Sequence, residues 1–408
     1  MEHLHAEQSP ASALAVVSHQ TLAIGTATPI HSGNSLSLAT VLIPETSDST
    51  TLPNNTAKAH THSANAIRLI NTKGLSRREW LAVRRQGIGG SDAAAAVGLN
   101  PYQSQLELWM IKTGRFTEND GDESDANHSS AQQSAVMPDI ESKMYWGQVL
   151  EPIVAQHYTK VTGRKVRKVN AILQHADSDK SWMLANIDYR VVGSDEVQLL
   201  ECKTAGEYGA KLWKDGVPEY VQCQVQHQLA VTGLQAADVC VLICGQQLKI
   251  YRIERDEELI TKLIELERLF WHYVQSNTTP CADGSESAGF ALRCLFPQDD
   301  GQRVDFSNNT HVSSLFDSLI NTRQQLAFYQ KQEEFYKQLL QQNLGEASYA
   351  QFAQGVISWK KSKDSVYLDT TALVKDHPQL CQQYQRSKVG SRRFLVSERP
   401  VANSKASD

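Results

Sequence analysis

The stretch 182–205, WMLANIDYRVVGSDEVQLLECKTA, decides the fold, because two β-rich runs in it are separated by a short polar turn. Residues 182–192 and 197–205 are rich in branched and aromatic side chains, which is typical of strands. Residues 193–196, Gly-Ser-Asp-Glu, have the composition of a hairpin turn. The stretch therefore predicts two neighbouring antiparallel strands.

Two carboxylates and an ammonium are expected on one side of this hairpin. Successive side chains of a strand point to opposite faces, so Glu201 and Lys203 share one face and Cys202 lies on the other. If the strands pair through the turn, Asp188 reaches the same region. Charged side chains among apolar strand neighbours must be paired or must coordinate a metal.

This grouping is suited to phosphodiester chemistry. Two carboxylates and a backbone carbonyl match the hard oxygen ligands that Mg²⁺ prefers. Lys203 would orient and help to deprotonate an attacking water while stabilising charge on a scissile phosphate. A structural Glu–Lys pair on a sheet face explains the pattern equally well, and a second Glu-x-Lys occurs at 141–143.

A third carboxylate stands on the helix expected before the strands. Glu151 lies in WGQVLEPIV, a mainly apolar stretch. A third acid at the same centre is reasonable for a site that holds one or two metal ions. The alternative is an ordinary solvated acid on a helix surface.

A glycine-rich turn, GIGGSD at residues 87–92, precedes a short alanine-rich helix. Glycines let backbone N–H groups approach an anion, and Arg84 and Arg85 just upstream carry forked donors suited to phosphate. The alternative is a plain turn with Ser91 as the helix N-cap and Asp92 as a cap. The pattern is neither a Walker loop nor a dinucleotide fingerprint.

The remaining chain is expected to form one α/β core with extensions. Hydrophobic periodicity and composition predict five regions, which are a disordered tail at 1–70, the core at 71–280 with an acidic insertion at 117–139, a linker at 281–310, a helical arm at 311–346 and a small α/β region at 347–408. In the last region GVISWKKSK and RRFLVS are strand-like.

Composition gives no sign of a nucleic-acid binder, because the formal net charge is −5. The seven cysteines lack paired CxxC spacing and are expected to be reduced thiols. Neither a signal peptide nor an apolar stretch of about 18 residues is seen, which predicts a soluble intracellular protein without membrane contact.

Several of these motifs together resemble a known family. The matching elements are Trp80-x3-Arg84-x6-Ser91, Trp146-Gly147-x3-Glu151, Asp188, Glu201-x-Lys203, Gln224-Val225-Gln226 and the run GIGGSDAAAAVGLNPY. The chain resembles the YqaJ-like phage recombination exonucleases, relatives of lambda exonuclease in the PD-(D/E)xK nuclease superfamily. The resemblance covers about 75–275 and, more loosely, 355–397. It implies a restriction-endonuclease-like α/β core, a central mixed sheet flanked by helices, with a helical C-terminal extension.

The resemblance also implies an activity. Relatives digest double-stranded DNA from 5′ ends with Mg²⁺, for which Mn²⁺ would be a substitute, and leave a 3′ overhang for a single-strand annealing protein. It implies cytoplasmic action in a bacterial host, a phage or mobile-element origin, and a homo-oligomer such as a ring trimer. Two alternatives stay open: a restriction-type endonuclease on the same fold, and a catalytically inactive DNA-binding recombination accessory protein.

The resemblance assigns roles to the candidate residues. Asp188, Glu201 and the Cys202 backbone carbonyl would hold the metal, with Glu151 nearby. Lys203 would serve the attacking water, and Gln224 would support the site. Arg84 and Ser91 would hold the terminal 5′-phosphate, with Arg85 as a further DNA contact.

Overall fold

A five-stranded mixed sheet forms the centre of the core in the computed structural model, which describes residues 66–115, 143–387 and 390–397. In spatial order its strands are β2 (Lys165–Lys168), β5 (Tyr189–Val192), β6 (Leu199–Ala205), β7 (Ala236–Ile243) and β8 (Gln247–Glu254). Only the β6–β7 pair of this sheet is parallel. The expected central mixed sheet and the β5–β6 hairpin are confirmed.

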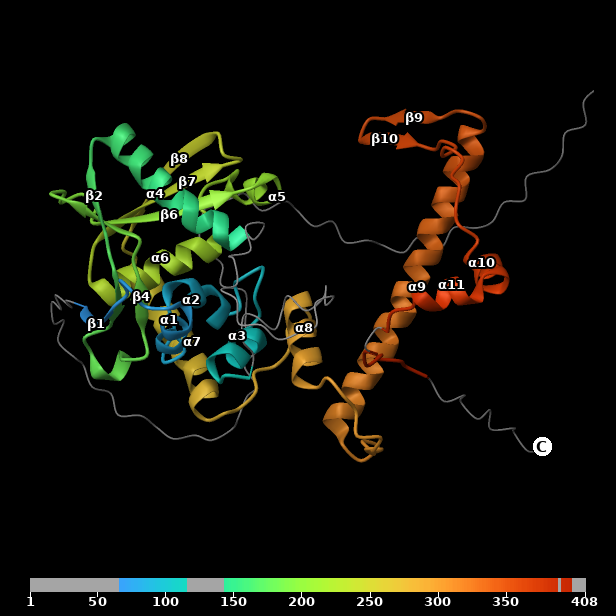
Figure 1. The fold of residues 1–408 in the computed structure, drawn as a ribbon, viewed down its shortest axis with the longest axis horizontal. Coiled ribbons are helices and arrows are strands. Elements are labelled where there is room, and N and C mark those ends of the chain that lie inside the picture. Colours follow the sequence, from blue (N-terminus) through green and yellow to red (C-terminus); the bar gives the residue numbers. More distant parts are fainter. Residues whose placement is uncertain (1–65, 116–142, 388–389, 398–408) are drawn as a thin grey trace, which may run out of the picture. The chain divides into compact units, whose positions relative to one another are not determined.

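One helix covers each face of this sheet (Figure 1). Parallel strands need a crossover connection, and α6 (Glu219–Thr232) provides it between β6 and β7. Gly233, with φ of 71°, ends α6 in the left-handed conformation. The helix α4 (Lys143–Thr162) lies on the opposite face.

The alternation predicted for β6 follows from these two layers. Leu199 packs in the cluster that includes Val225 and Leu229 of α6. Leu200 and the partly buried Cys202 pack in the cluster on the α4 side. Glu201 and Lys203 therefore belong to the α6 face.

The run 182–192 is not one continuous strand, which corrects the expectation. Its first part, β4 (Leu184–Asn186), belongs to a second, antiparallel sheet of order β1–β3–β4. The other strands of that sheet are β1 (Ile67–Asn71) and β3 (Ala171–Gln174). The chain changes sheets at Ile187–Asp188, which local composition does not encode. The strand β1 begins inside the range expected to be tail.

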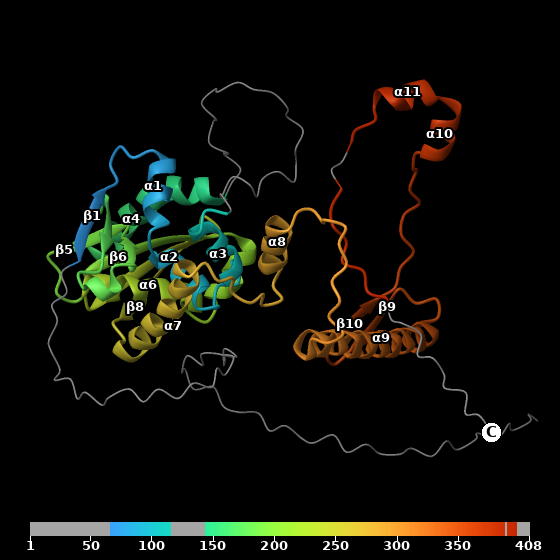
Figure 2. The same cartoon turned by 90° about the horizontal axis from the view of Figure 1, so that it is seen from below.

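The remaining helices of the core lie mainly on the α6 side of the five-stranded sheet, the side that faces the viewer in Figure 2. They are α1 (Arg77–Arg84), α2 (Gly90–Ala96), α3 (Gln105–Lys112), α5 (Glu207–Ala210), α7 (Glu257–Gln275) and α8 (Glu286–Leu295). The helix α1 begins with a capping box formed by Ser76 and Glu79.

The helix α8 differs from the linker expected at 281–310. Ser287 Oγ donates to Glu107 Oε2 at 2.5 Å and accepts the Ser104 N–H at 2.7 Å, which fastens α8 to α3. Ala288 and Ala291 are buried, so two small side chains mark the apolar side of α8.

The C-terminal region is a separate set of elements. It contains α9 (Thr310–Leu344), the antiparallel strands β9 (Tyr349–Phe352) and β10 (Gly355–Ser358), α10 (Thr370–Asp376) and α11 (Pro378–Gln383). The helical extension is confirmed. The segment RRFLVS is not a strand, and its Phe394 and Leu395 are exposed. A β-rich sequence without a pairing partner does not make a strand.

Two predicted segments, most of the tail at 1–70 and the acidic insertion at 117–139, lie outside the described residues. Within the described ranges, no helix combines the length and the apolar character needed to span a membrane.

Candidate active site

Asp188 lies beside β6, where its side chain accepts a hydrogen bond that the backbone of a neighbouring strand would otherwise accept. The β5–β6 ladder pairs Tyr189 with Leu200 and Arg190 with Leu199, and ends there. Next to it, the Cys202 N–H donates to Asp188 Oδ2 at 2.9 Å. In a strand, the N–H and C=O of one residue point to the same edge, so the Cys202 carbonyl also faces the edge where Asp188 lies. The hairpin thus brings Asp188 to β6.

Glu201 is held on the α6 face by three donors. It is 4% exposed. Its Oε1 accepts from Lys203 Nζ at 2.8 Å and Gln224 Nε2 at 2.6 Å. Its Oε2 accepts from Gln228 Nε2 at 2.8 Å. The network is closed by Lys203 Nζ, which also donates to Gln224 Oε1 at 2.8 Å. Gln224 therefore orients both charged groups.

The electrostatics of these groups favour a cation. Burial raises the pKa of Asp188 well above its ordinary value, and the negative charges of Glu201 and Glu151 raise it further. Burial alone would lower the pKa of Lys203, but Glu201 and Asp188 outweigh it and the pKa is raised. Lys203 is therefore held as an ammonium, while excess negative charge remains around Asp188.

A cavity of about 310 Å³, which we call the catalytic cavity, joins the predicted residues. Its lining includes Glu151, Asp188, Glu201, Cys202 and Lys203. Glu151 Oε1 accepts from Lys168 Nζ at 2.8 Å, so this acid is occupied by an ion pair. All three predicted acids thus line one cavity.

The oxygen donors of the catalytic cavity fit a hard divalent cation. The fitting ligands are two carboxylates and a backbone carbonyl, and not three acidic side chains. Among the described residues, no group of three or more His, Cys, Asp or Glu side chains is placed to hold a metal ion. The set that fits is the carboxylates of Asp188 and Glu201 with the Cys202 carbonyl. Burial, followed by the charge of Asp188, raises the pKa of the Cys202 thiol, so its sulfur remains protonated and is not a ligand.

The glycine turn is pressed against β4. The Ile88 N–H donates to the Trp182 carbonyl at 2.7 Å. A Cβ on Gly87 would lie 2.3 Å from that same carbonyl oxygen, so no other residue fits there. Gly89, and not Ser91, is the N-cap of α2, and Asp92 Oδ2 accepts the Gly89 N–H at 2.9 Å. This corrects the expected cap at Ser91 and confirms the capping role of Asp92.

Arg84 and Ser91 are in direct contact. Arg84 Nη2 donates to Ser91 Oγ and to Asp92 Oδ1, both at 2.6 Å, and Lys112 Nζ donates to Asp92 Oδ2 at 2.7 Å. Burial would raise the pKa of Asp92, but Arg84 and Lys112 outweigh it and lower the pKa. Arg84 and Lys112 thus share one ionised carboxylate beside the exposed Ser91.

Two further observations bear on Arg84 and Ser91, the candidate 5′-phosphate site of the sequence analysis, which we call the phosphate pocket. Arg84 Nε is buried and has no acceptor among the residues that the structure describes. The Arg85 guanidinium lies near Gly114, past the end of α3, with its Nη1 3.9 Å from the position of a Cβ on that glycine. The structure therefore brings Arg84 and Ser91 together and places Arg85 by another residue.

The phosphate pocket adjoins the catalytic groups through α6. A Cβ on Gly90 would lie 3.1 Å from Gln228 Cγ and 3.3 Å from the Gln224 carbonyl oxygen. The start of α2 is thus in contact with the two glutamines that hold Glu201. Gln228 was missed at first, although its position four residues after Gln224 on a helix places both on one face.

A buried ion pair between His227 and Glu267 joins α6 to α7. His227 Nδ1 lies 2.8 Å and 3.0 Å from the two carboxylate oxygens of Glu267 on α7, and Nε2 lies 2.9 Å from the Leu184 carbonyl of β4. Both ring nitrogens can donate only in the imidazolium form. Burial would lower the pKa of His227, but Glu267 outweighs it and raises the pKa. Sequence spacing gave no signal for this pair.

Comparisons with known proteins show which proteins this chain is similar to. The family model of the YqaJ-like viral recombinase domain matches residues 79–235. The uncharacterized protein YqaJ of Bacillus subtilis (strain 168) is 31% identical over 334 residues, which are 81% of this chain and 97% of that protein. A crystal structure of an alkaline exonuclease, LHK-Exo, from Laribacter hongkongensis is 22% identical and covers 49% of this chain and 94% of its own, with a TM-score of 0.36. LHK-Exo in complex with dAMP is 24% identical with the same coverage and a TM-score of 0.37.

Proposed function

The chain belongs to the YqaJ-like viral recombinase family, and we propose that it is a Mg²⁺-dependent exonuclease that digests one strand of linear double-stranded DNA in the 5′-to-3′ direction. One observation carries the proposal. Asp188, Glu201, the edge of β6 at Cys202 and Lys203 meet at one cavity, where excess negative charge adjoins a fixed ammonium.

The metal would be held by the carboxylates of Asp188 and Glu201 and by the Cys202 carbonyl, with Glu151 as a further ligand once it leaves Lys168. Mn²⁺ would substitute. The ion would lower the pKa of a bound water and offset charge on the scissile phosphate. Three donors, from Lys203, Gln224 and Gln228, fix the position of Glu201.

Lys203 would act as a donor. Because its pKa is raised, it keeps its proton at neutral pH and orients the attacking water while stabilising charge that develops on the phosphate. Gln224 would keep the ammonium and Glu201 in register, since it bonds to both. This role is narrower than the water deprotonation expected at first.

The phosphate pocket would hold the terminal 5′-phosphate and so direct the enzyme to ends. Replacing Arg84 by alanine is expected to reduce the preference for 5′-phosphorylated over 5′-hydroxyl duplex ends by about tenfold to a hundredfold, since a hydrogen bond to a charged group is lost. Initial digestion rates on the two substrates measure this ratio. Arg78→Ala, at an exposed position of the same helix, is the control.

The exposed Ser91 offers a second variant, because Arg84→Ala also removes a partner of Asp92 and can disturb folding. Ser91→Ala should move the ratio in the same direction by a smaller factor. If both variants remain folded and keep the wild-type ratio, these residues do not bind the 5′-phosphate.

The decisive experiment incubates linear and circular duplex DNA with the full chain in Mg²⁺ or in EDTA. We expect nucleotide release from linear DNA in Mg²⁺ alone, with a single-stranded 3′ overhang left behind. Cutting of covalently closed circles would indicate a restriction-type endonuclease instead. Binding without cutting in Mg²⁺ would indicate an inactive recombination accessory protein.

The proposed setting follows from the product. A 3′ overhang is the substrate of a single-strand annealing protein, which we propose as the partner, in the cytoplasm of a bacterial host. A homo-oligomer such as a ring trimer would encircle the duplex and keep the enzyme on it between cuts.

A further inference from the structure

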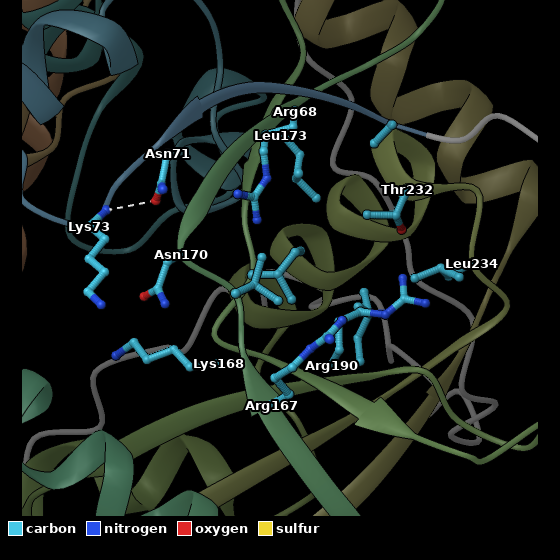
Figure 3. Close-up of a pocket in the computed structure, with 14 residues that line it drawn as sticks. Arg68, Asn71, Lys73, Arg167, Lys168, Asn170, Leu173, Arg190, Thr232 and Leu234 are labelled. Atoms are coloured by element: carbon cyan, nitrogen blue, oxygen red, sulfur yellow. Dashed lines mark hydrogen bonds between the residues drawn. The ribbon is translucent and has the colours of Figure 1, made fainter.

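A second cavity, of about 610 Å³, lies between strands of the two sheets and is lined by five cations. They are Arg68 of β1, Lys73, Arg167 and Lys168 of β2 and Arg190 of β5. Figure 3 shows these side chains around the cavity together with the amides of Asn71 and Asn170. We call it the basic cavity. Its volume falls in the range of ligand pockets, about 300–1,000 Å³.

The basic cavity is positively charged, although the chain as a whole has a negative net charge. No carboxylate is among its lining residues, although the net charge of the chain is −5. Lys168 is paired with Glu151. Within the described ranges, the other four cations have no carboxylate partner. Such a local excess of positive charge attracts an anion from outside the chain.

The register of β2 and β5 makes this grouping of positive charges unfavourable for the stability of the sheet. Arg167 of β2 lies directly opposite Arg190 of β5 in their antiparallel ladder. Like charges directly opposite each other destabilise a strand pair. Arg68 is brought to the same cavity by a different sheet. Three guanidinium groups thus line one cavity, and guanidinium is the side chain best matched to phosphate oxygens.

The basic cavity adjoins the catalytic cavity through the backbone of β2 and β5. The N–H of Val169, which lines the basic cavity, donates to the Asp188 carbonyl at 3.0 Å. Lys168 lines the basic cavity and bonds to Glu151 of the catalytic cavity at 2.8 Å. One backbone hydrogen bond and one ion pair thus join the linings of the two cavities.

We propose that the basic cavity binds backbone phosphates of the DNA whose end occupies the catalytic cavity. The inference rests on the proposed nuclease function, because it identifies the ligand by continuity with that site. A repeating phosphate chain fits cations that come from three strands and a loop better than a single small anion does. The amides of Asn71 and Asn170 add donors of the kind that contact phosphate and sugar oxygens.

The test measures affinity for a fluorescent duplex with a 3′ single-stranded overhang, in EDTA so that no digestion occurs, over a series of salt concentrations. The full chain is compared with Arg68→Ala/Arg167→Ala. Each phosphate contact contributes about 0.9 on duplex and about 0.7 on single strands to the slope of log affinity against log salt. We expect the double variant to reduce that slope by about 1.4 to 1.8.

The matched control is Lys160→Ala/Arg268→Ala, which removes two exposed cations that line neither cavity. It should leave the slope unchanged. Thermal melting shows whether both variants are folded, and Lys73→Ala, at an exposed loop position, gives a third variant if the first does not fold. A wild-type slope in the folded cavity variants overturns the proposal.

Other ligands have distinct outcomes. If dAMP or inorganic phosphate binding depends on Arg68 and Arg167 while the DNA slope does not, the cavity takes free phosphates and the proposal fails. If poly-glutamate binding alone depends on them, the partner is an acidic protein and the proposal also fails. Digestion of linear DNA by the wild type in Mg²⁺ is read separately, so that loss of the nuclease function and loss of this site are distinguished.

Discussion

Replacing Lys203 by alanine is expected to lower the rate of strand digestion on the order of 10² to 10³-fold, because a preorganised charge at the reacting phosphate is lost. The ammonium is fixed by Glu201 and Gln224 at 2.8 Å each, so little reorganisation is needed when charge develops. Release of labelled nucleotides from a linear duplex in saturating Mg²⁺ measures the rate.

The control for this variant is Lys160→Ala, an exposed lysine of α4, which should digest DNA at the wild-type rate. Lys203→Arg keeps the charge but not the compact ammonium, and we expect a partial recovery at most. If Lys203→Ala remains folded and keeps full activity, the assignment of the catalytic cavity is wrong.

Replacing Glu267 by glutamine is expected to lower the free energy of unfolding by about 3–5 kcal/mol, because a buried imidazolium loses the carboxylate that bonds to it. His227 and Glu267 are both 0% exposed, so water does not replace the lost partner. Urea or thermal unfolding measures the change. Glu265→Gln, at an exposed position of the same helix, should leave stability within about 0.5 kcal/mol of wild type.

The pH dependence of this difference has a defined sign. The folded-state pKa of His227 is raised above its ordinary value of 6.5. The stability that the pair contributes is therefore fully present below pH 6.5, while Glu267 is ionised, and is lost as the pH rises through the folded-state pKa. The gap between wild type and Glu267→Gln should be largest near pH 6 and shrink in alkaline buffer. A gap that grows with pH would show that His227 is neutral in the folded protein.

The hairpin and the sides of β6 could be predicted from the sequence, because alternation in a strand is a local property. It sufficed to place Glu201 and Lys203 on one face and Cys202 on the other. The break at Asp188 could not be predicted, since the run 182–192 is β-rich throughout and only pairing with β3 or β6 decides which sheet each half joins. Strands β1 and β3 are short, and they could not be predicted alone because their pairing with each other stabilises them.

The functional site likewise combines residues that are close in the sequence with residues that are far apart in it. Arg84 and Ser91 are seven residues apart and were paired by the family resemblance, whereas Lys112, which also bonds to Asp92, comes from another helix. The cations of the basic cavity are spread from residue 68 to residue 190 and form a group only after two sheets fold. Net charge, at −5, gave the opposite impression.

The β5–β6 ladder ends next to Asp188, and a substitution of Asp188 therefore affects folding as well as the active site. Since this carboxylate receives the Cys202 amide, its removal leaves a backbone donor unsatisfied, at a cost of about 1–3 kcal/mol. A saturation library at this position would be depleted by misfolding as well as by inactivity. Survival at position 188 therefore reports two requirements at once, an acceptor for the Cys202 amide and the carboxylate of the active site.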